Sequence, residues 1–214
     1  MALAPNLFTG EIERLLTPAA VATGFGFLRS LPPEVQRDPA AIQRRIAERP
    51  TEERAVLEAL RRIQNPEEHL RFARDLVGVA DGLRSRADVD PTKVGSVGFC
   101  FGGGMSALLA CHDPKLAACV IFYGNSPSEE LVAKARCPIL GLYGGEDHRI
   151  TDTVPELERA ARAHHVRFEA HVYPGAQHAF FNDTRPMYNA EAAQDAWRRV
   201  LNFFGEGLLA TGSK

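Results

Sequence analysis

The stretch GSVGFCFGGG, residues 95–104, decides the fold because it joins a short apolar segment to a run of glycines. Residues 94–99 have the character of a short buried strand. The glycines that follow, together with the apolar residues 105–110, predict a helix that starts within the glycine run. Cys100 stands where the strand meets the helix. A buried structural cysteine needs no glycines around it, so the stretch indicates a reactive thiol.

Gly98 and Gly102 flank this cysteine in the pattern Gly-x-Cys-x-Gly, a nucleophile elbow with sulfur in place of oxygen. Such a turn strains the backbone of the nucleophile and lifts its side chain clear of the sheet. We expect both glycines to be needed for the close approach of strand and helix. The start of a helix also favours a thiolate and offers backbone N–H groups.

Three further segments have strand patterns. Residues 116–124 and 138–144 are near-continuous apolar runs bounded by turn residues, which indicates strands covered on both faces, as in a parallel sheet. Residues 166–173 alternate apolar and polar side chains, which predicts a half-exposed strand nearer the sheet edge. Helical patterns separate these strands, so the sequence predicts an α/β doubly wound fold.

Helices are predicted before and after the strands. Asn65 begins a helix that reaches about Ser85, and Thr153 is expected to cap another. The last helix is expected to pack one apolar face, made of Ala193, Trp197, Val200, Leu201 and Phe204. Residues 11–64 read as several short helices without a strand. They predict a mainly helical insertion within a single domain, residues 1–214.

Composition narrows the classes of function. The chain has 214 residues and a formal net charge of −2, so it carries no general attraction for nucleic acid or anionic lipid. No apolar run approaches the ~18 residues that a membrane-spanning helix needs. The chain has four cysteines, Cys100, Cys111, Cys119 and Cys137. Their spacing fits neither a metal site nor a disulfide framework, which is typical of a protein in a reducing cytoplasm. We therefore expect a cytoplasmic protein without nucleic-acid or membrane partners.

A reactive cysteine needs a base, and the base needs an orienting group. In open α/β sheets such groups lie on loops after the carboxyl ends of strands. Asp147 follows the strand 138–144, and His178 follows the strand 166–173. The order Cys100, Asp147, His178 is the nucleophile, acid, histidine order of α/β-hydrolases. We predict these three residues as the catalytic set.

Other residues compete for these roles. Glu146 and Asp152 are alternative acids, with Asp152 the second choice. His148 lies beside the acid and is a candidate for substrate contact. The other five histidines have no metal-ligating spacing. His69 and His112 are expected to be solvated, and His164, His165 and His171 to lie on the surface. The glycine run lacks the spacing of a phosphate-binding loop.

Four stretches together resemble the dienelactone hydrolase family of α/β-hydrolases. GFCFGG (98–103) resembles the family's nucleophile motif, and LYGGEDHRI (142–150) and YPGAQHAFF (173–181) resemble its acid and histidine motifs. ALAPNLF (2–8) is similar to a segment near the family's start. The resemblance covers nearly the whole chain and is weakest over residues 17–64. It implies a mostly parallel sheet of α/β-hydrolase type with helices on both faces.

The resemblance implies a hydrolase of activated esters or lactones, acting on a small molecule. Cys100 would attack the carbonyl, His178 held by Asp147 would move the proton, and the backbone N–H of Phe101 would donate to the oxyanion. Enol lactones and aryl esters are the expected substrates, because sulfur leaves more readily than an ordinary alkoxide. No metal and no organic cofactor are implied. Arg149 is a candidate for holding a substrate carboxylate, as is Arg185.

Family members have further elements before the segment that resembles residues 2–8, including a parallel strand that carries the second oxyanion donor. These elements have no counterpart before Met1. We therefore expect an N-terminally truncated sheet that is poorly stable, weakly active, or rescued by self-association across its open edge. Two other functions stay open. One is a non-catalytic relative that acts as a binding module, and the other is a thiol-redox sensor that uses Cys100.

Overall fold

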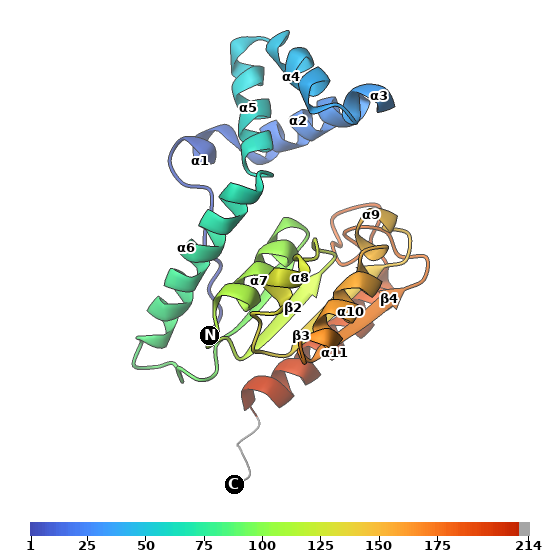
Figure 1. Cartoon of the computed structure of the whole chain (residues 1–214). Helices are drawn as coiled ribbons and strands as arrows, with labels where there is room; N and C mark the ends of the chain where they lie inside the picture. The colour runs from blue at the N-terminus through green and yellow to red at the C-terminus, as the bar shows by residue number, and fades with distance from the viewer. Residues whose placement is uncertain (210–214) are drawn as a thin grey trace. The chain divides into compact units, whose positions relative to one another are not determined.

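The computed structural model describes residues 1–209, which form two compact units whose boundary falls inside one helix (Figure 1). The helical unit is Ala2–Arg71, and its helices are α1 (Glu11–Leu15), α2 (Pro18–Ser30), α3 (Pro33–Gln36), α4 (Pro39–Ala47), α5 (Thr51–Arg62) and the start of α6 (Pro66–Arg84). Helix α2 packs closely on α5, since a Cβ at Gly24 would lie 2.4 Å from Leu60 Cδ1. The helical content expected for residues 11–64 is present, while their place within a single domain stays a prediction.

The sheet unit, Met1 with the residues from Phe72 onward, contains a four-stranded sheet in the order β1-β2-β3-β4. Its strands are β1 (Gly95–Phe99), β2 (Ala118–Phe122), β3 (Ile139–Gly144) and β4 (Phe168–Tyr173). Every neighbouring pair is parallel. Strands β2 and β3 are buried along their whole length, and β4 lies half-exposed at one edge. The parallel sheet and the positions of its strands confirm the fold predicted from the sequence.

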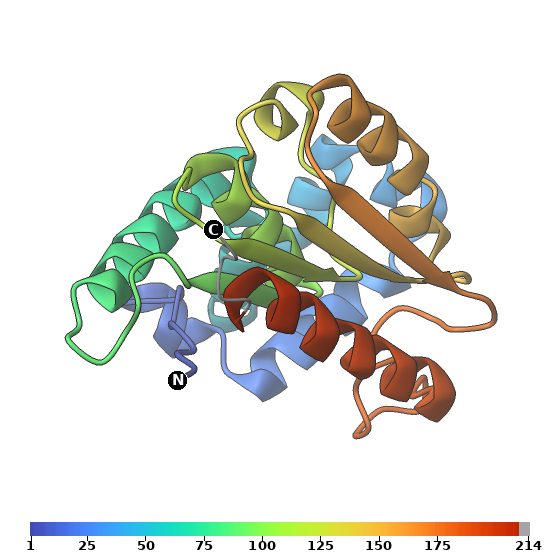
Figure 2. The same cartoon turned by 90° about the horizontal axis from the view of Figure 1, so that it is seen from below.

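Helices cover both faces of the sheet. The sheet unit contains the rest of α6, then α7 (Phe101–His112), α8 (Glu129–Val132), α9 (His148–Thr151), α10 (Val154–Ala163), α11 (Ala190–Phe204) and the short π-helix η1 (Gly205–Leu209). Helices α6, α7 and α10 contribute Ala80, Ala107 and Val154 to the core on one face. Helix α11 packs on the other face, where Figure 2 shows it in red beneath the strands.

Two local predictions were correct only in part. The inner face of α11 combines small residues, among them Ala193 and Ala196, with Val200 and Phe203. Trp197 and Leu201, in contrast, are 47% and 54% exposed. The close packing of α11 on the sheet accounts for this, because alanines permit a nearer approach than the indole would. Thr153 lies at the N-cap position of α10 as predicted, but its side chain makes no cap hydrogen bond; its hydroxyl donates instead to the carbonyl of Ile150 at 2.7 Å.

The outer edge of β1 is open: among residues 1–209, only β2 pairs with this strand. Two of its side chains, Val97 and Phe99, are 44% and 41% exposed. The segment 1–9 forms no strand. Within the same described residues, no helix is both long enough and apolar enough to cross a membrane.

Candidate active site

Cys100 occupies the turn between β1 and α7 in a strained conformation. Its φ is 55°, a left-handed value that a non-glycine residue seldom adopts. The turn is held on both sides: the N–H of Cys100 donates to the carbonyl of Phe122 at 3.0 Å, and its own carbonyl accepts from the N–H of Gly104 at 3.2 Å. Cys100 is an exposed residue, although its thiol is partly desolvated. The strained turn therefore presents the sulfur to solvent at the carboxyl end of β1.

The glycines around the turn have unequal roles. A Cβ at Gly98 would lie 1.9 Å from the carbonyl oxygen of Gly102, so the strand can meet the helix only without a side chain there. A Cβ at Gly103 would lie 2.6 Å from the carbonyl oxygen of Phe122. A Cβ at Gly102, in contrast, would meet nothing within 4 Å. The expectation that Gly102 is required for close approach was wrong, and Gly103 has that role.

Asp147 and His178 lie on the loops that follow β3 and β4. Asp147 precedes the first turn of α9 and is 7% exposed. His178 lies three residues after the turn at residues 174–175. The two loops can meet because β3 ends in glycine: a Cβ at Gly144 would lie 2.5 Å from the carbonyl oxygen of Ala176. Parallel strands thus bring both side chains to the edge of the sheet that carries the cysteine.

The three side chains form a continuous chain of contacts. His178 Nδ1 lies 2.5 Å from Asp147 Oδ2, and His178 Nε2 lies 3.1 Å from Cys100 Sγ. With Nδ1–H donating to the carboxylate, Nε2 faces the sulfur. The alternative acid, Asp152, lies elsewhere: its carboxylate is 3.4 Å from His148 Nδ1, and both side chains are exposed.

This arrangement shifts the ionisation of the thiol and the imidazole in opposite directions. The hydrogen bond with His178 lowers the pKa of Cys100 below the 9.0 of an ordinary thiol, against the opposing effect of burial. The backbone N–H of Phe101 and the charge of Arg149 add to the lowering of that pKa. The hydrogen bond with Cys100 raises the pKa of His178, and the bond with Asp147 adds to it. Both shifts favour a thiolate beside an imidazolium.

The other histidines lie outside this cluster. His164 and His171 face Glu129 and Glu169 near the protein surface. His69 and His112 are not simply solvated as expected, because each is partly buried with a ring nitrogen within 2.9 Å of a backbone carbonyl. Across residues 1–209, no group of three or more His, Cys, Asp or Glu side chains is placed to hold a metal ion.

Sequence reasoning missed Tyr123, which follows β2 directly. Its ring lies edge-on to the His178 imidazole, with 5.1 Å between ring centroids. In the sequence it stands in the apolar run 116–124 and looks like a core residue. The one available signal was its position immediately before Gly124, at the end of a buried strand.

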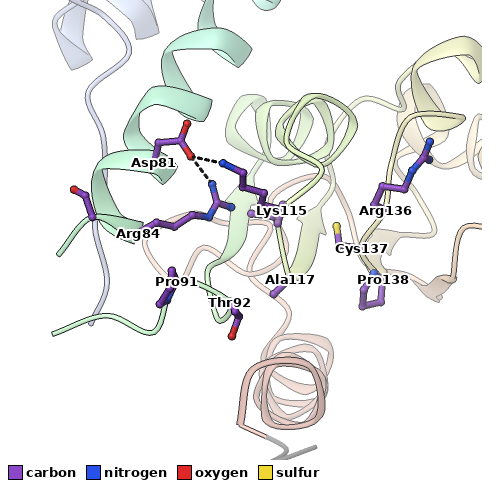
Figure 3. Close-up of a pocket in the computed structure, with 11 residues that line it drawn as sticks. Asp81, Arg84, Pro91, Thr92, Lys115, Ala117, Arg136, Cys137 and Pro138 are labelled. Carbon is purple, nitrogen blue, oxygen red and sulfur yellow. Dashed lines mark hydrogen bonds and ion pairs between the residues drawn. The ribbon is translucent and has the colours of Figure 1, made fainter. Parts of the chain in front are cut away.

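A pocket of about 800 Å³ lies at the opposite end of the sheet (Figure 3). It is lined by the end of α6 and by the segments that lead into β2 and β3, including Arg84, Lys115 and Arg136. Arg84 is already engaged there, since it forms ion pairs with Asp81 and Asp113. The chemistry described above belongs to the carboxyl ends of the strands, so this pocket is separate from it.

Iodoacetamide is expected to alkylate Cys100 well before the other cysteines. Cys100 is exposed with a lowered pKa, whereas burial raises the pKa of Cys111 to about 12 and that of Cys119 to about 11, and also raises that of Cys137. Because the thiolate is the nucleophile, the rate should rise as pH passes through the Cys100 pKa, below 9.0. Peptide mass spectrometry over a time course measures the order of labelling.

Removal of the histidine provides the control for this labelling. His178→Ala should move the midpoint of the pH profile upward, because it removes the largest cause of the lowered thiol pKa. Equal labelling of all four cysteines in the folded protein would contradict the prediction.

The parallel sheet with helices on both faces, and the strained turn at Cys100 between strand and helix, are those of an α/β-hydrolase. The model of the dienelactone hydrolase family matches residues 1–208. The chain belongs to the dienelactone hydrolase family.

Individual relatives agree with this assignment. A protein of Saccharolobus solfataricus, provisionally named carboxymethylenebutenolidase, is 38% identical over 205 residues, which cover 95% of this chain and 77% of the relative. A protein of the same provisional name from Escherichia coli K12 is 40% identical over 131 residues, or 56% of this chain. The crystal structure of a provisionally assigned dienelactone hydrolase from Klebsiella pneumoniae aligns with a TM-score of 0.58 at 37% identity, covering 63% of this chain.

The length of the match differs among these relatives. The aligned part covers 48% of the E. coli protein and 60% of the Klebsiella chain. The chain therefore spans about half the length of several relatives that it matches.

Proposed function

We propose that the chain hydrolyses activated esters or lactones through a thioester on Cys100. The observation that carries this proposal is the unbroken contact from Asp147 through His178 to the sulfur, with distances of 2.5 and 3.1 Å. The strained left-handed backbone of Cys100 and the opposite pKa shifts of the thiol and the imidazole support the same assignment.

In the first half of the reaction the Cys100 thiolate attacks the carbonyl carbon, forming a C–S bond while the carbonyl π electrons move to oxygen. The backbone N–H of Phe101, at the start of α7, donates to this oxyanion. The C–O bond to the leaving group then breaks, and its oxygen takes the proton from Nε2 of the His178 imidazolium. The products are a thioester and a neutral imidazole.

In the second half a water molecule attacks the thioester. His178 Nε2 accepts a proton from this water as the new C–O bond forms, and the C–S bond breaks to return the thiolate. Asp147 keeps the imidazole oriented, because its Oδ2 accepts from Nδ1–H throughout. The carboxylic acid product leaves, and the starting ion pair is restored.

The nucleophile sets the substrate class. A thiolate is a better leaving group than an alkoxide, so a tetrahedral intermediate from an ordinary alkyl ester mostly returns to the substrate. Enolate and phenolate leaving groups compete with the thiolate and allow the reaction to go forward. The name of the S. solfataricus relative specifies a butenolide, which is an unsaturated lactone, and this agrees with the same class.

A rapid-quench experiment with p-nitrophenyl acetate tests the proposal. We expect a burst of about one p-nitrophenolate per chain, followed by slower steady turnover, and an acetyl group on the peptide that contains Cys100. Acid quenching preserves the thioester for mass spectrometry. Steady hydrolysis with no acetyl group on Cys100 would overturn the thioester mechanism.

A further inference from the structure

Strained residues are concentrated around the candidate active site. The described residues include four non-glycine positions with positive φ: Cys100, Tyr123, His165 and Ala179. Cys100 is the nucleophile of the proposed function, and Ala179 directly follows His178. Tyr123 has a φ of 38° and is not part of the catalytic set. A left-handed conformation costs a bulky residue roughly 1–3 kcal/mol, so a native structure keeps it only where surrounding contacts impose it.

The structure shows which contacts impose the strain. The carbonyl of Phe122 accepts the N–H of Cys100 at 3.0 Å, and the N–H of Tyr123 donates to the carbonyl of Leu142 at 2.8 Å. The next residue, Gly124, lies so close to α7 that a Cβ there would be 2.4 Å from the carbonyl carbon of Gly103. The end of β2 is therefore fixed between the nucleophile turn and β3, and the chain must turn sharply at Tyr123.

This sharp turn brings the tyrosine ring into contact with the His178 ring. The ring is almost completely buried and lies edge-on to the His178 imidazole, with 5.1 Å between centroids. Phe180 packs on the tyrosine at 5.4 Å and Phe99 at 6.4 Å. Burial, with the nearby Cys100 charge, raises the pKa of Tyr123 to about 12, so the phenol stays neutral at ordinary pH and adds no charge beside the thiolate.

We propose that Tyr123 is a positioning residue: its ring holds the His178 imidazole in the orientation that places Nδ1 on Asp147 Oδ2 and Nε2 on Cys100 Sγ. The imidazole contacts Asp147 through Nδ1 and Cys100 through Nε2, on opposite sides of the ring. Rotation of an unsupported ring would therefore lengthen both contacts at once. The role in turnover rests on the proposed function, whereas the role in pairing histidine with thiol can be measured without turnover.

Three variants separate the ring from the hydroxyl and from general packing. Tyr123→Phe keeps the ring, and Tyr123→Leu removes it. Tyr143→Leu is the matched control, because Tyr143 is an equally buried tyrosine, in β3, without a ring contact to His178 among the described contacts. Both leucine variants should lower the midpoint of urea unfolding, since each leaves a cavity. Only Tyr123→Leu should alter the thiol.

The measurements are the pH profile of Cys100 alkylation and kcat/KM for p-nitrophenyl acetate. Tyr123→Leu should move the alkylation midpoint upward and lower kcat/KM about 10- to 100-fold, the scale of a misplaced catalytic group. Tyr123→Phe should stay within about threefold of the unmodified protein in both. Tyr143→Leu should leave the alkylation midpoint unchanged.

An unchanged alkylation midpoint in Tyr123→Leu would overturn the proposal. An equal effect in Tyr123→Phe would also overturn it, because the hydroxyl rather than the ring would then be responsible. If the unmodified protein forms no thioester while the alkylation midpoint shifts as expected, the proposed function fails and the positioning role stands.

Discussion

Cys100→Ala should lower kcat/KM for an activated aryl ester by at least about 10⁴-fold, to the level of a protein that only binds the substrate. In the proposed mechanism the variant removes the atom to which the acyl group is transferred, and no other thiol can replace it. The remaining cysteines are buried, and burial raises their pKa values, so they carry almost no thiolate at neutral pH. Steady-state hydrolysis, with circular dichroism to verify folding, measures the effect.

A matched pair of acids extends this test to the orientation of the histidine. Asp147→Asn should lower kcat/KM by about 10³- to 10⁴-fold, because an amide no longer fixes Nδ1–H and stabilises no imidazolium. Asp152→Asn removes an equivalent charge five residues away, on an exposed side chain paired with His148, and should stay within about twofold. Full activity in Cys100→Ala, or equal losses in the two asparagine variants, would sink the assignment.

Gly98→Ala should prevent stable folding of the sheet unit. The new methyl carbon would lie 1.9 Å from the carbonyl oxygen and 2.2 Å from the carbonyl carbon of Gly102. Both atoms belong to the backbone of the first turn of α7, so no flexible side chain can yield, and the strand and the helix would have to separate. We expect a loss of more than about 4 kcal/mol in the free energy of unfolding, measured by urea denaturation.

Gly102→Ala is the control, with the same chemical change in the same motif. Its Cβ would meet nothing within 4 Å, and its backbone is helical. The free energy of unfolding should therefore stay within about 1 kcal/mol of the unmodified protein, with a gain favoured by the higher helix propensity of alanine. A Gly98→Ala protein that unfolds at the original urea midpoint would contradict the geometry of the turn.

The sequence predicts the sheet because its central strands have an unambiguous composition. Strands β2 and β3 are buried on both faces, so they read as continuous apolar runs, and β4 at the edge reads as an alternation. The convergence of Cys100, Asp147 and His178 follows from the same topology, because the carboxyl ends of parallel strands lie at one edge. The distances between them come from the structure alone.

The predictions that failed depend on tertiary distances. A Gly-x-Cys-x-Gly pattern cannot tell which glycine lies against another backbone; the structure assigns that role to Gly98 and Gly103. The pattern of α11 equally cannot show that Trp197 faces solvent while alanines face the sheet. The proposed role of Tyr123 depends on its left-handed backbone. A tyrosine in an apolar run gives no sign of that conformation, so the sequence did not predict it.

The order of the strands has a consequence for synthesis on the ribosome. Because the sheet order repeats the chain order, each new strand can join the edge formed by the strand made before it. Of the four described strands, β1 is made first and brings the cysteine, whereas the histidine arrives only after β4. A nascent chain therefore carries an ordinary thiol while most of the sheet assembles. The hydrogen bond with His178 is the largest cause of the lowered pKa of Cys100, so we expect that pKa to fall only when the last loop docks, and an unfinished chain to react more slowly with acylating and oxidising agents.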